Sequence, residues 1–435
     1  MNDRFLQPLI ERLLKFVGLH QTLNYASACK HYRLERRWLI EEQAIVCCRH
    51  VGQFADDLVP KHLSACGETS EQLAMLPATV ERLTLRDFVT LGQGFQQLPN
   101  NVTLPPTLTH LTFGDQFNRS IDIVVLPSTL LHLTFGNCYN LPLDNVTLPP
   151  TLTHLTFGFW YNQPLDNVAL PPSLTHLTFG YAFDQPLDQV HLSPTLLYLK
   201  FGDHFDHSLD NVALPPTLTH LTFGAGFTQW LNHVTLPSAL THLTFGRSFN
   251  RPLDNVALPA TLTHLTFGCL FNQPLDNVTL PGTLTHLTFG TRFDQPLDKV
   301  GFPPTLLYLK FGDRFNRPLH NVTLPQTLKQ LTFGARFNKS LYRWTLPPSL
   351  THLTFGCDFD QLLDNVQLPP TLTHLTFGTC FNRRLDQVTL PRTLTHLNFG
   401  CFYSQSLENV TLPEGLTLTA ATGLQRYRDR SRTQK

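Results

Sequence analysis

The sequence predicts a mainly β solenoid built from 22-residue coils, with a small α-helical segment at the N-terminal end. Phe-Gly recurs fourteen times between residues 113 and 400, always 22 residues apart and without one insertion or deletion. Within each copy the apolar residues alternate with polar ones over short stretches and do not follow a helical spacing of 3.6 residues. A fixed period of this length is typical of a repeat array in which each unit forms one coil.

The copy at residues 148–170 shows how one coil should be built. Residues 155–157 are Leu-Thr-Phe and residues 168–170 are Val-Ala-Leu, each with large apolar side chains at alternate positions, so we expect two short strands per coil. Pro149 marks one turn and Gly158 the other. Stacked coils place identical residues on one another, so we expect the invariant column of Leu111 and the aromatic column of Phe117 to form the core.

The period also sets the domain organisation. An imperfect copy at 76–85 precedes the fourteen regular ones, so the solenoid is expected over 76–419. Residues 42–75 are interpreted as a linker and N-terminal cap, and 420–435 as a basic disordered tail. Residues 1–41 have apolar side chains at helical spacing and form a separate helical segment.

Composition excludes several classes of function. The formal net charge is zero and only 15% of residues are charged, so no broad basic surface argues for nucleic acid. No stretch offers about 20 apolar residues, so no membrane span is expected. We expect a soluble monomer with no cofactor. The nine cysteines form no CxxC pair and are interpreted as free thiols, although Cys357, Cys380 and Cys401 could instead form a redox-active or metal-binding cluster.

Two polar columns should face solvent. Because residues 155 and 157 point inward, His154 and Thr156 should point outward. Histidine occupies this column in eleven copies: His110, His132, His154, His176, His220, His242, His264, His286, His352, His374 and His396. We expect a ladder of stacked, hydrogen-bonded and mostly neutral imidazoles, with metal binding by neighbouring pairs as the alternative. The second column consists of Asp122, Asp144, Asp166, Asp188, Asp210, Asp254, Asp276, Asp298, Asp364 and Asp386, for which turn formation is a better explanation than calcium binding.

The breaks in these columns are the candidate partner-binding residues. LLYLKFGD occurs at 196–203 and 306–313, so that tyrosine and lysine replace histidine and threonine on the exposed strand, and a glutamine follows in the next copy. Three arginines occupy one loop column in consecutive coils and could bind an acidic peptide or phosphate. The candidates are Tyr198, Lys200, Tyr308, Lys310, Gln330, Arg292, Arg314 and Arg336, with neutral drift or a solvated edge as the alternatives.

No residue is assigned a catalytic role or a metal. The sequence contains no P-loop, no GxSxG, no HExxH and no unique pair of carboxylates, and fourteen equivalent positions do not form one unique active site. The threonine columns leave one further alternative, an ice- or lattice-binding surface.

Copies such as LPPTLTHLTFGFWYNQPLDNV resemble the FNIP repeat, a leucine-rich-repeat relative abundant in social amoebae and in giant viruses of amoebae. The Phe-Asn-Ile-Pro segment is represented by FNQPL at 271–275 and by FNRPL at 249–253. This resemblance implies a leucine-rich-repeat-like fold and a noncatalytic protein-binding scaffold. Because the N-terminal stretch has acidic residues and no sustained apolar core, it is interpreted as neither a signal peptide nor a membrane span, and we expect a cytoplasmic location, which is the host cytoplasm if the chain is viral.

The N-terminal segment PLIERLLKFVGLHQTLNYASACKHYRLERRWL resembles a degenerate F-box. The matching residues are Pro8, Glu11, Leu13, Leu14, Val17, Leu23, Ala26, Cys29, Lys30 and Tyr32, although the opening is Gln-Pro and tyrosine replaces the usual tryptophan. An F-box implies binding to a Skp-type adaptor and, through it, to a cullin ubiquitin ligase. The leading hypothesis is therefore a substrate-recognition adaptor, and the alternative is a stand-alone scaffold with a vestigial cap.

Overall fold

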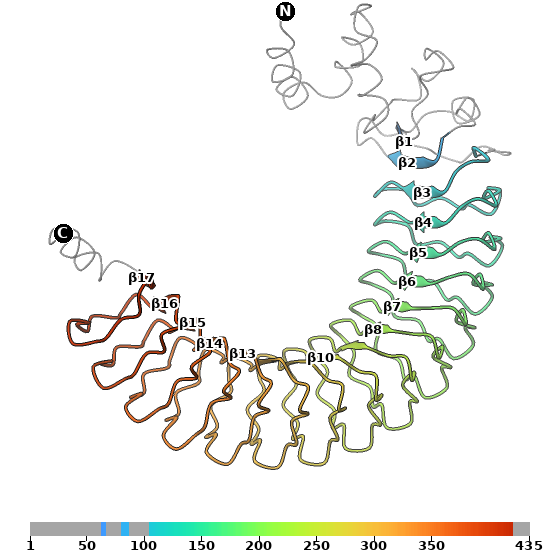
Figure 1. The fold of residues 1–435 in the computed structure, drawn as a ribbon. Coiled ribbons are helices and arrows are strands. Elements are labelled where there is room, and N and C mark those ends of the chain that lie inside the picture. Colours follow the sequence, from blue (N-terminus) through green and yellow to red (C-terminus); the bar gives the residue numbers. More distant parts are fainter. Residues whose placement is uncertain (1–61, 67–79, 87–103, 421–435) are drawn as a thin grey trace, which may run out of the picture. The chain divides into compact units, whose positions relative to one another are not determined.

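The computed structural model describes residues 62–66, 80–86 and 104–420. The chain divides into two compact units, Met1–Gly202 and Asp203–Lys435. Each unit is a stack of coils with one parallel β-sheet (Figure 1). The first contains β1 (His62–Cys66), β2 (Arg82–Arg86), β3 (His110–Phe113), β4 (His132–Thr134), β5 (His154–Thr156), β6 (His176–Thr178) and β7 (Tyr198–Lys200). The second contains β8 (His220–Thr222), β9 (His242–Thr244), β10 (His264–Thr266), β11 (His286–Thr288), β12 (Tyr308–Lys310), β13 (Gln330–Thr332), β14 (His352–Thr354), β15 (His374–Thr376), β16 (His396–Phe399) and β17 (Thr417–Ala420).

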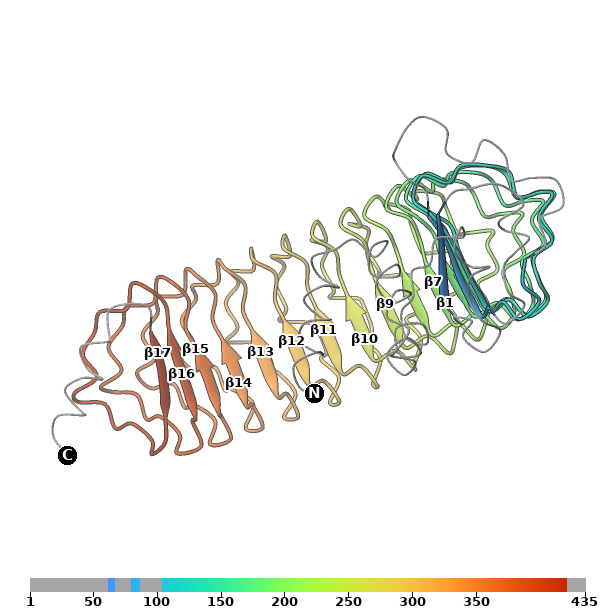
Figure 2. The ribbon, with the colours of Figure 1, turned by 90° about the horizontal axis from the view of Figure 1, so that it is seen from above.

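The strands of successive coils pair in parallel with equivalent residues opposite one another. Leu265 of β10 pairs with Leu287 of β11, and the flanking histidines and threonines pair in the same register. Figure 2 shows the strands of the second unit side by side. This register places every strand side chain next to the equivalent side chain of the following coil, as the 22-residue period predicts.

The coils of each unit fan apart from the strand side outward. In the second unit, ring centroids of successive coils are 4.1 Å apart for His242 and His264, 5.7 Å for Phe245 and Phe267, and 6.2 Å for Phe249 and Phe271. The same three columns in the first unit give 4.1, 5.6 and 6.3 Å. The strand face is therefore the concave face of each unit.

This fanning explains why one strand prediction is wrong. Residues 154–156 form β5 as expected, but residues 168–170 form no strand. A parallel ladder needs chains about 4.8 Å apart. The coils are already more than 6 Å apart at the outer aromatic column, so main-chain pairing cannot continue on the far side.

The expected core columns are confirmed. Leu111 and Phe117 are almost fully buried, and their equivalents are buried in every regular coil. Three turns shape a coil: the amides of Leu152, Tyr161 and Val168 donate to the carbonyls three residues earlier, at 3.0, 3.3 and 3.0 Å. These turns lie where proline, glycine and Asp-Asn occur in the sequence, as predicted.

The repeated glycine is required by close packing between coils. The only positive φ among the glycines of the described residues belongs to Gly415, outside the Phe-Gly column. A Cβ atom built on Gly246 would overlap the carbonyl group of Gly224 in the preceding coil, and other Phe-Gly glycines behave alike. Gly282, in contrast, has no atom within 4 Å of such a Cβ. Only the first kind of position excludes a side chain.

Both ends of the array carry additional paired strands. The register joins Arg82 of β2 to His110 of β3, so the imperfect copy is a true first coil, and β1 pairs with β2. At the other end β17 pairs with β16. The predicted helical segment 1–41 and residues 421–435 of the predicted basic tail lie outside the described residues, whereas Ala420 ends β17. Within the described ranges, no helix is long and apolar enough to cross a membrane.

Candidate interaction surface

The strand face is formed by three repeated positions, which are threonine, histidine and threonine in a regular coil. In the coil that contains β10 these are Thr263, His264 and Thr266, and the inward leucine between the last two is buried. The histidine and both threonines are half-buried. The outward orientation expected for these columns is therefore confirmed.

Hydrogen bonds fix the tautomer of the ladder histidines. The hydroxyl of Thr263 lies 3.0 Å from the carbonyl oxygen of Thr241 and 2.9 Å from Nδ1 of His264. A carbonyl can only accept, so the single hydroxyl proton of Thr263 is donated there. Nδ1 of His264 must then carry the proton and donate to the threonine. In the neutral ring this leaves Nε2, at the far end, with a bare lone pair.

The same pair of hydrogen bonds recurs along both units. It occurs at Thr109, Thr153, Thr175, Thr241, Thr263, Thr285, Thr351, Thr373 and Thr395, each with the histidine that follows. Thr219 also lies 2.9 Å from Nδ1 of His220, whereas His132 follows Leu131 and has no such threonine. The expected ladder is thus confirmed, with threonine as its fixed support.

Several of the stacked rings also favour the neutral form, because their pKa is lowered. Centroids of neighbouring histidines lie 4.0–4.3 Å apart. Burial and, to a smaller extent, the neighbouring imidazoles lower the pKa of His154 and of His242 to about 4. Burial likewise lowers the pKa of His264 and of His374. A charged ring would be poorly hydrated and would face like charges.

Tyrosine ends two of the histidine runs. Tyr198 stacks on His176 with ring centroids 5.8 Å apart, and Tyr308 stacks on His286 at 5.7 Å. The longer interruption lies at β12 and β13, where Tyr308 pairs with Gln330. The histidines therefore form runs of four, four and three, each confined to one unit.

At β12 and β13 the strand face has a different chemistry, and we name residues Leu307, Tyr308, Lys310, Lys329 and Gln330 the Tyr-Lys patch. Leu307 is 37% exposed, and Lys310, Lys329 and Gln330 are exposed. The amide of Lys329 donates to the carbonyl of Leu307 at 2.8 Å, so the two coils are adjacent there. The strand-face positions of β8–β16 include no aspartate or glutamate. The Tyr-Lys patch therefore combines an apolar side chain, a phenol and two uncompensated cations.

The patch brings together three of the predicted candidates and adds two residues. Tyr308, Lys310 and Gln330 were expected from the breaks in the histidine column. Leu307 and Lys329 were missed, although both replace the threonine that supports the histidine in regular coils. Tyr198 and Lys200 form a smaller equivalent on β7, beside the exposed Leu197.

The three candidate arginines lie on a different surface. Arg292, Arg314 and Arg336 are exposed in the turn after Phe-Gly, and each amide donates to the preceding coil at 2.7–2.8 Å. They occupy one column in consecutive coils, as predicted. Because they are on the loop edge and not on a strand, they are separate from the Tyr-Lys patch.

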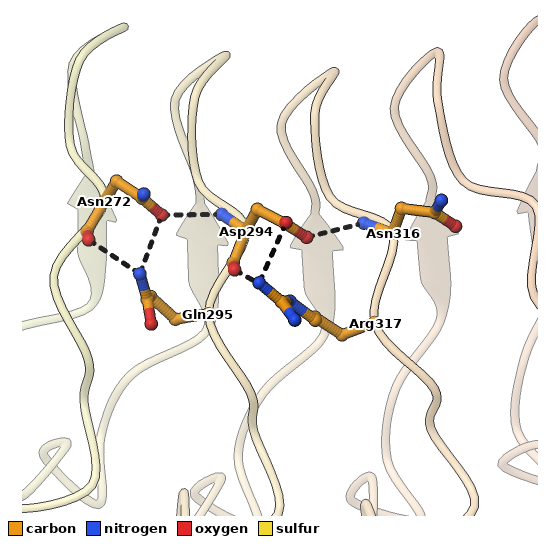
Figure 3. Close-up of polar contacts among 5 residues, drawn as sticks. All are labelled: Asn272, Asp294, Gln295, Asn316 and Arg317. Carbon is orange, nitrogen blue, oxygen red and sulfur yellow. Dashed lines mark hydrogen bonds and ion pairs between the residues drawn. The ribbon is translucent and has the colours of Figure 1, made fainter.

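A ladder of Asn and Asp residues, which sequence reasoning missed, ties the coils together beside the buried aromatic column (Figure 3). Oδ1 of Asn272 accepts the amide of Asp294 at 2.8 Å, and Oδ1 of Asp294 accepts the amide of Asn316 at 2.9 Å. Gln295 and Arg317 bind back to the preceding coil, and Arg317 also forms a 3.1 Å ion pair with Asp294. The signal was the recurring Asn or Asp directly after the aromatic residue.

The predicted aspartate column does form turns, but by a different mechanism. The turn at Leu165–Val168 contains Asp166 and is closed by the main-chain bond from Val168 to Leu165 at 3.0 Å. The carboxylates of Asp144 and Asp166 are exposed and accept no main-chain hydrogen bond in the part of the chain that the structure describes. These aspartates therefore occupy exposed turn positions, but their side chains do not stabilise the turn by hydrogen bonding.

The cysteines and the F-box-like residues are the remaining candidates from the sequence. Cys138, Cys269, Cys357, Cys380 and Cys401 are free thiols, as expected. Within the described ranges no three His, Cys, Asp or Glu side chains form a metal-binding group, which argues against the Cys357, Cys380 and Cys401 cluster as a metal site. All ten F-box-like residues lie outside the described residues.

Comparison with known proteins accounts for this repeat. The FNIP Repeat model matches seven consecutive stretches: residues 95–138, 139–182, 183–226, 227–270, 271–314, 315–358 and 359–402. The chain belongs to the FNIP repeat family. Each FNIP match covers two coils, and the Phe-Asn of the motif supplies the buried ring and the next rung of the Asn and Asp ladder.

Among solved structures, this FNIP chain is 39% identical to CroV588, described as a novel circular LRR protein, with a TM-score of 0.67. The match covers 83% of this chain, which spans 59% of the length of CroV588. The fold is thus a leucine-rich-repeat solenoid. YopM from Yersinia enterocolitica is 19% identical with a TM-score of 0.36, covering 81% of this chain and 95% of that protein. No curated protein matches the sequence.

Proposed function

We propose that this FNIP chain is a noncatalytic scaffold whose strand face binds a protein partner, with the Tyr-Lys patch as the principal contact. The observation that supports it is the combination of Leu307, Tyr308 and two lysines on a face without acidic residues. Tyrosine and apolar anchors dominate the energy of protein interfaces. Lysine at such a surface adds charge complementarity and faster association.

The partner segment has a defined chemistry. Its acidic side chains pair with Lys310 and Lys329, while an apolar or aromatic side chain packs against Leu307 and Tyr308. The ring of Tyr308 is already supported by His286, so little side-chain entropy is lost on binding. The neutral histidine runs on either side neither attract nor repel this acidic segment.

The test restores the regular pattern inside the patch. The full chain and the variant Tyr308→His, Lys310→Thr, Lys329→Thr, Gln330→His are used to capture proteins from an amoebal lysate, with quantification by mass spectrometry. A partner held by the patch is lost with the variant and retained by a control, Arg292→Ala, Arg314→Ala, Arg336→Ala. Equal capture by the wild type and the patch variant excludes the patch, and loss with the control alone assigns binding to the loop edge.

The ubiquitin ligase connection is the second part of the proposal. It is supported by the F-box resemblance of residues 1–41, in which Leu13 and Leu14 supply the apolar face for a Skp-type adaptor. The full chain is mixed with purified adaptor and cullin, and Leu13→Asp, Leu14→Asp serves as the matched variant. Binding by the wild type only supports a ligase adaptor. No binding by either leaves a stand-alone scaffold and removes the ligase part.

A further inference from the structure

We propose that the chain associates with a second copy of itself, in place of the monomer expected from the sequence. Exposed aromatic side chains on the first unit of one copy bind exposed arginines on the second unit of the other copy. Both surfaces lie on the loop edge, in the turn that follows Phe-Gly. The contact is therefore separate from the Tyr-Lys patch and does not depend on the proposed partner.

The aromatic half consists of Phe159, Trp160 and Tyr181, which we name the aromatic edge. These residues are 38%, 54% and 40% exposed. Phe159 stacks on Tyr181 of the next coil with ring centroids 4.5 Å apart, and Trp160 forms a T-shaped contact with Phe159 at 4.7 Å. Three adjoining rings that already hold one another in place lose little side-chain entropy on binding, and such an exposed apolar cluster is typical of an interaction surface.

Polar groups continue the same edge toward the N-terminus. Asp115 and Asn137 occupy the turn position of Phe159 and Tyr181 in the two preceding coils, and both are exposed. Nδ2 of Asn137 donates to Oδ1 of Asp115 at 3.0 Å, which holds the carboxylate in place. The two residues after Phe-Gly in these four coils include no lysine or arginine. A guanidinium group suits this edge, because it stacks on aromatic rings and pairs with a carboxylate.

The arginine half has the opposite composition at the same turn of the coil. We name Arg292, Arg314 and Arg336 the arginine edge; all three are exposed, and none forms an ion pair within the described residues. The two residues after Phe-Gly in these three coils include one carboxylate, that of Asp313. Three guanidinium groups against one carboxylate leave this edge positively charged.

The two edges also have the same repeat. The amide of Ala182 donates to the carbonyl of Phe159 at 2.8 Å on the aromatic edge, and the amide of Arg314 donates to the carbonyl of Thr291 at 2.8 Å on the arginine edge. Both edges therefore present their side chains at the spacing of one coil. Because one sequence carries both complementary halves, a second copy supplies the matching surface. The contact is heterologous, since it joins different surfaces of the two copies.

The test is sedimentation velocity of the full chain over a wide range of concentration. Two variants each remove one edge: the aromatic variant carries Phe159→Ala, Trp160→Ala, Tyr181→Ala, and the arginine variant carries Arg292→Gln, Arg314→Gln, Arg336→Gln. The wild type should associate, and each variant should weaken association about tenfold or more. The matched control is Trp230→Ala, which removes a tryptophan that is 47% exposed and lies outside both edges, and it should associate as the wild type does.

A mixture of the two variants identifies which surfaces meet. It retains one intact pair of edges, the rings of the arginine variant and the arginines of the aromatic variant, so it should recover association that neither variant shows alone. A symmetric contact between two aromatic edges would leave the arginine variant unaffected. That result overturns the proposal, and so does a wild type that stays monomeric.

Circular dichroism confirms that each variant is folded before its association is measured. The replaced residues are exposed and the two variants lie in different units, so failure of one to fold leaves the other informative. Association of a folded edge variant at the wild-type level overturns the proposal. An equal loss in Trp230→Ala also overturns it, because association would then not depend on the two edges.

Discussion

The inward and outward columns of the coil are both repetitive, but for different physical reasons. Inward residues such as Leu265 and Phe267 are nearly fully buried, and Gly268 lies against the preceding coil so closely that no side chain fits. Outward residues such as Thr263 and His264 are half-exposed and are held by hydrogen bonds and stacking.

This difference determines where the sequence can change. No regular coil replaces its inward leucine or its glycine, whereas three strands replace the outward histidine. Loss of an inward residue leaves a cavity or a clash inside the array. Loss of an outward residue costs hydrogen bonds and stacking but leaves no cavity inside the array.

The largest expected effect tests the inward glycine column. Gly246→Ala places a methyl group against the main chain of Gly224, and we expect a loss of about 3 kcal/mol or more in the free energy of unfolding. Gly282→Ala is the matched control, because its Cβ meets open space and its φ is ordinary; its effect should stay within about 1 kcal/mol. Chemical denaturation measures both. Equal effects would show that the close approach is not what excludes a side chain.

The second prediction concerns pH and the outward histidines. The pKa of His154 and of His242 falls from about 6.5 in the unfolded chain to about 4 in the fold, so the unfolded state takes up protons first. Stability is therefore full above pH 6.5 and declines as the pH falls toward 4. Partial exposure makes the loss smaller than the full shift implies.

Thermal melts from pH 7.5 to 4.5 in buffer with a chelator measure this decline. His154→Gln, His242→Gln should flatten the curve in this range relative to the wild type. A wild-type melting temperature that does not change between pH 6.5 and 4.5 would contradict the lowered pKa values.

A smaller effect tests the support of the ladder. Thr241→Val keeps the shape of the side chain but removes its bonds to the carbonyl of Thr219 and to Nδ1 of His242, so a loss of about 1–2 kcal/mol is expected. Thr266→Val, on the same face, removes no hydrogen bond and should change stability by less than about 0.5 kcal/mol. Urea denaturation of both variants gives the difference. Similar values for the two would mean that the Thr-His bond contributes nothing.

The smallest effect concerns an exception in the inward aromatic column. The hydroxyl groups of Tyr139, Tyr161 and Tyr403 are buried without a hydrogen-bond partner, and burial raises the pKa of Tyr403 to about 12. Most other coils have phenylalanine at this position, so Tyr161→Phe should stabilise the chain by up to about 1 kcal/mol. Tyr342→Phe, at an exposed tyrosine, is the control. A lower melting temperature for Tyr161→Phe would show that the hydroxyl has a favourable role.

Much of this architecture could be predicted because a strict period converts one coil into all of them. The core columns, the outward histidines and the stacked ladder followed from alternation around Leu155 and Phe157. The absence of a strand at residues 168–170 could not be predicted, because the fanning of the coils depends on three-dimensional packing. The roles of Gly246 and Asn272 also required the neighbouring coil, because their close contacts are between residues 22 positions apart.

The candidate surface was predicted less completely. Breaks in the histidine column led to Tyr308, Lys310 and Gln330, but Leu307 and Lys329 lie in the adjacent threonine column, whose pairing with histidine becomes evident only from the hydrogen bonds. The F-box-like role of residues 1–41 remains a prediction that rests on resemblance alone.

The most direct test of the central claim is the protonation state of the ladder histidines, measured by long-range ¹H–¹⁵N correlation NMR on the metal-free full chain near pH 7. We predict neutral rings with Nδ1 protonated and Nε2 bare, and His264→Gln should remove one such signal. Rings protonated at Nε2 alone, or at both nitrogens, would contradict the account, because the threonine hydroxyls would then not support the ladder as described.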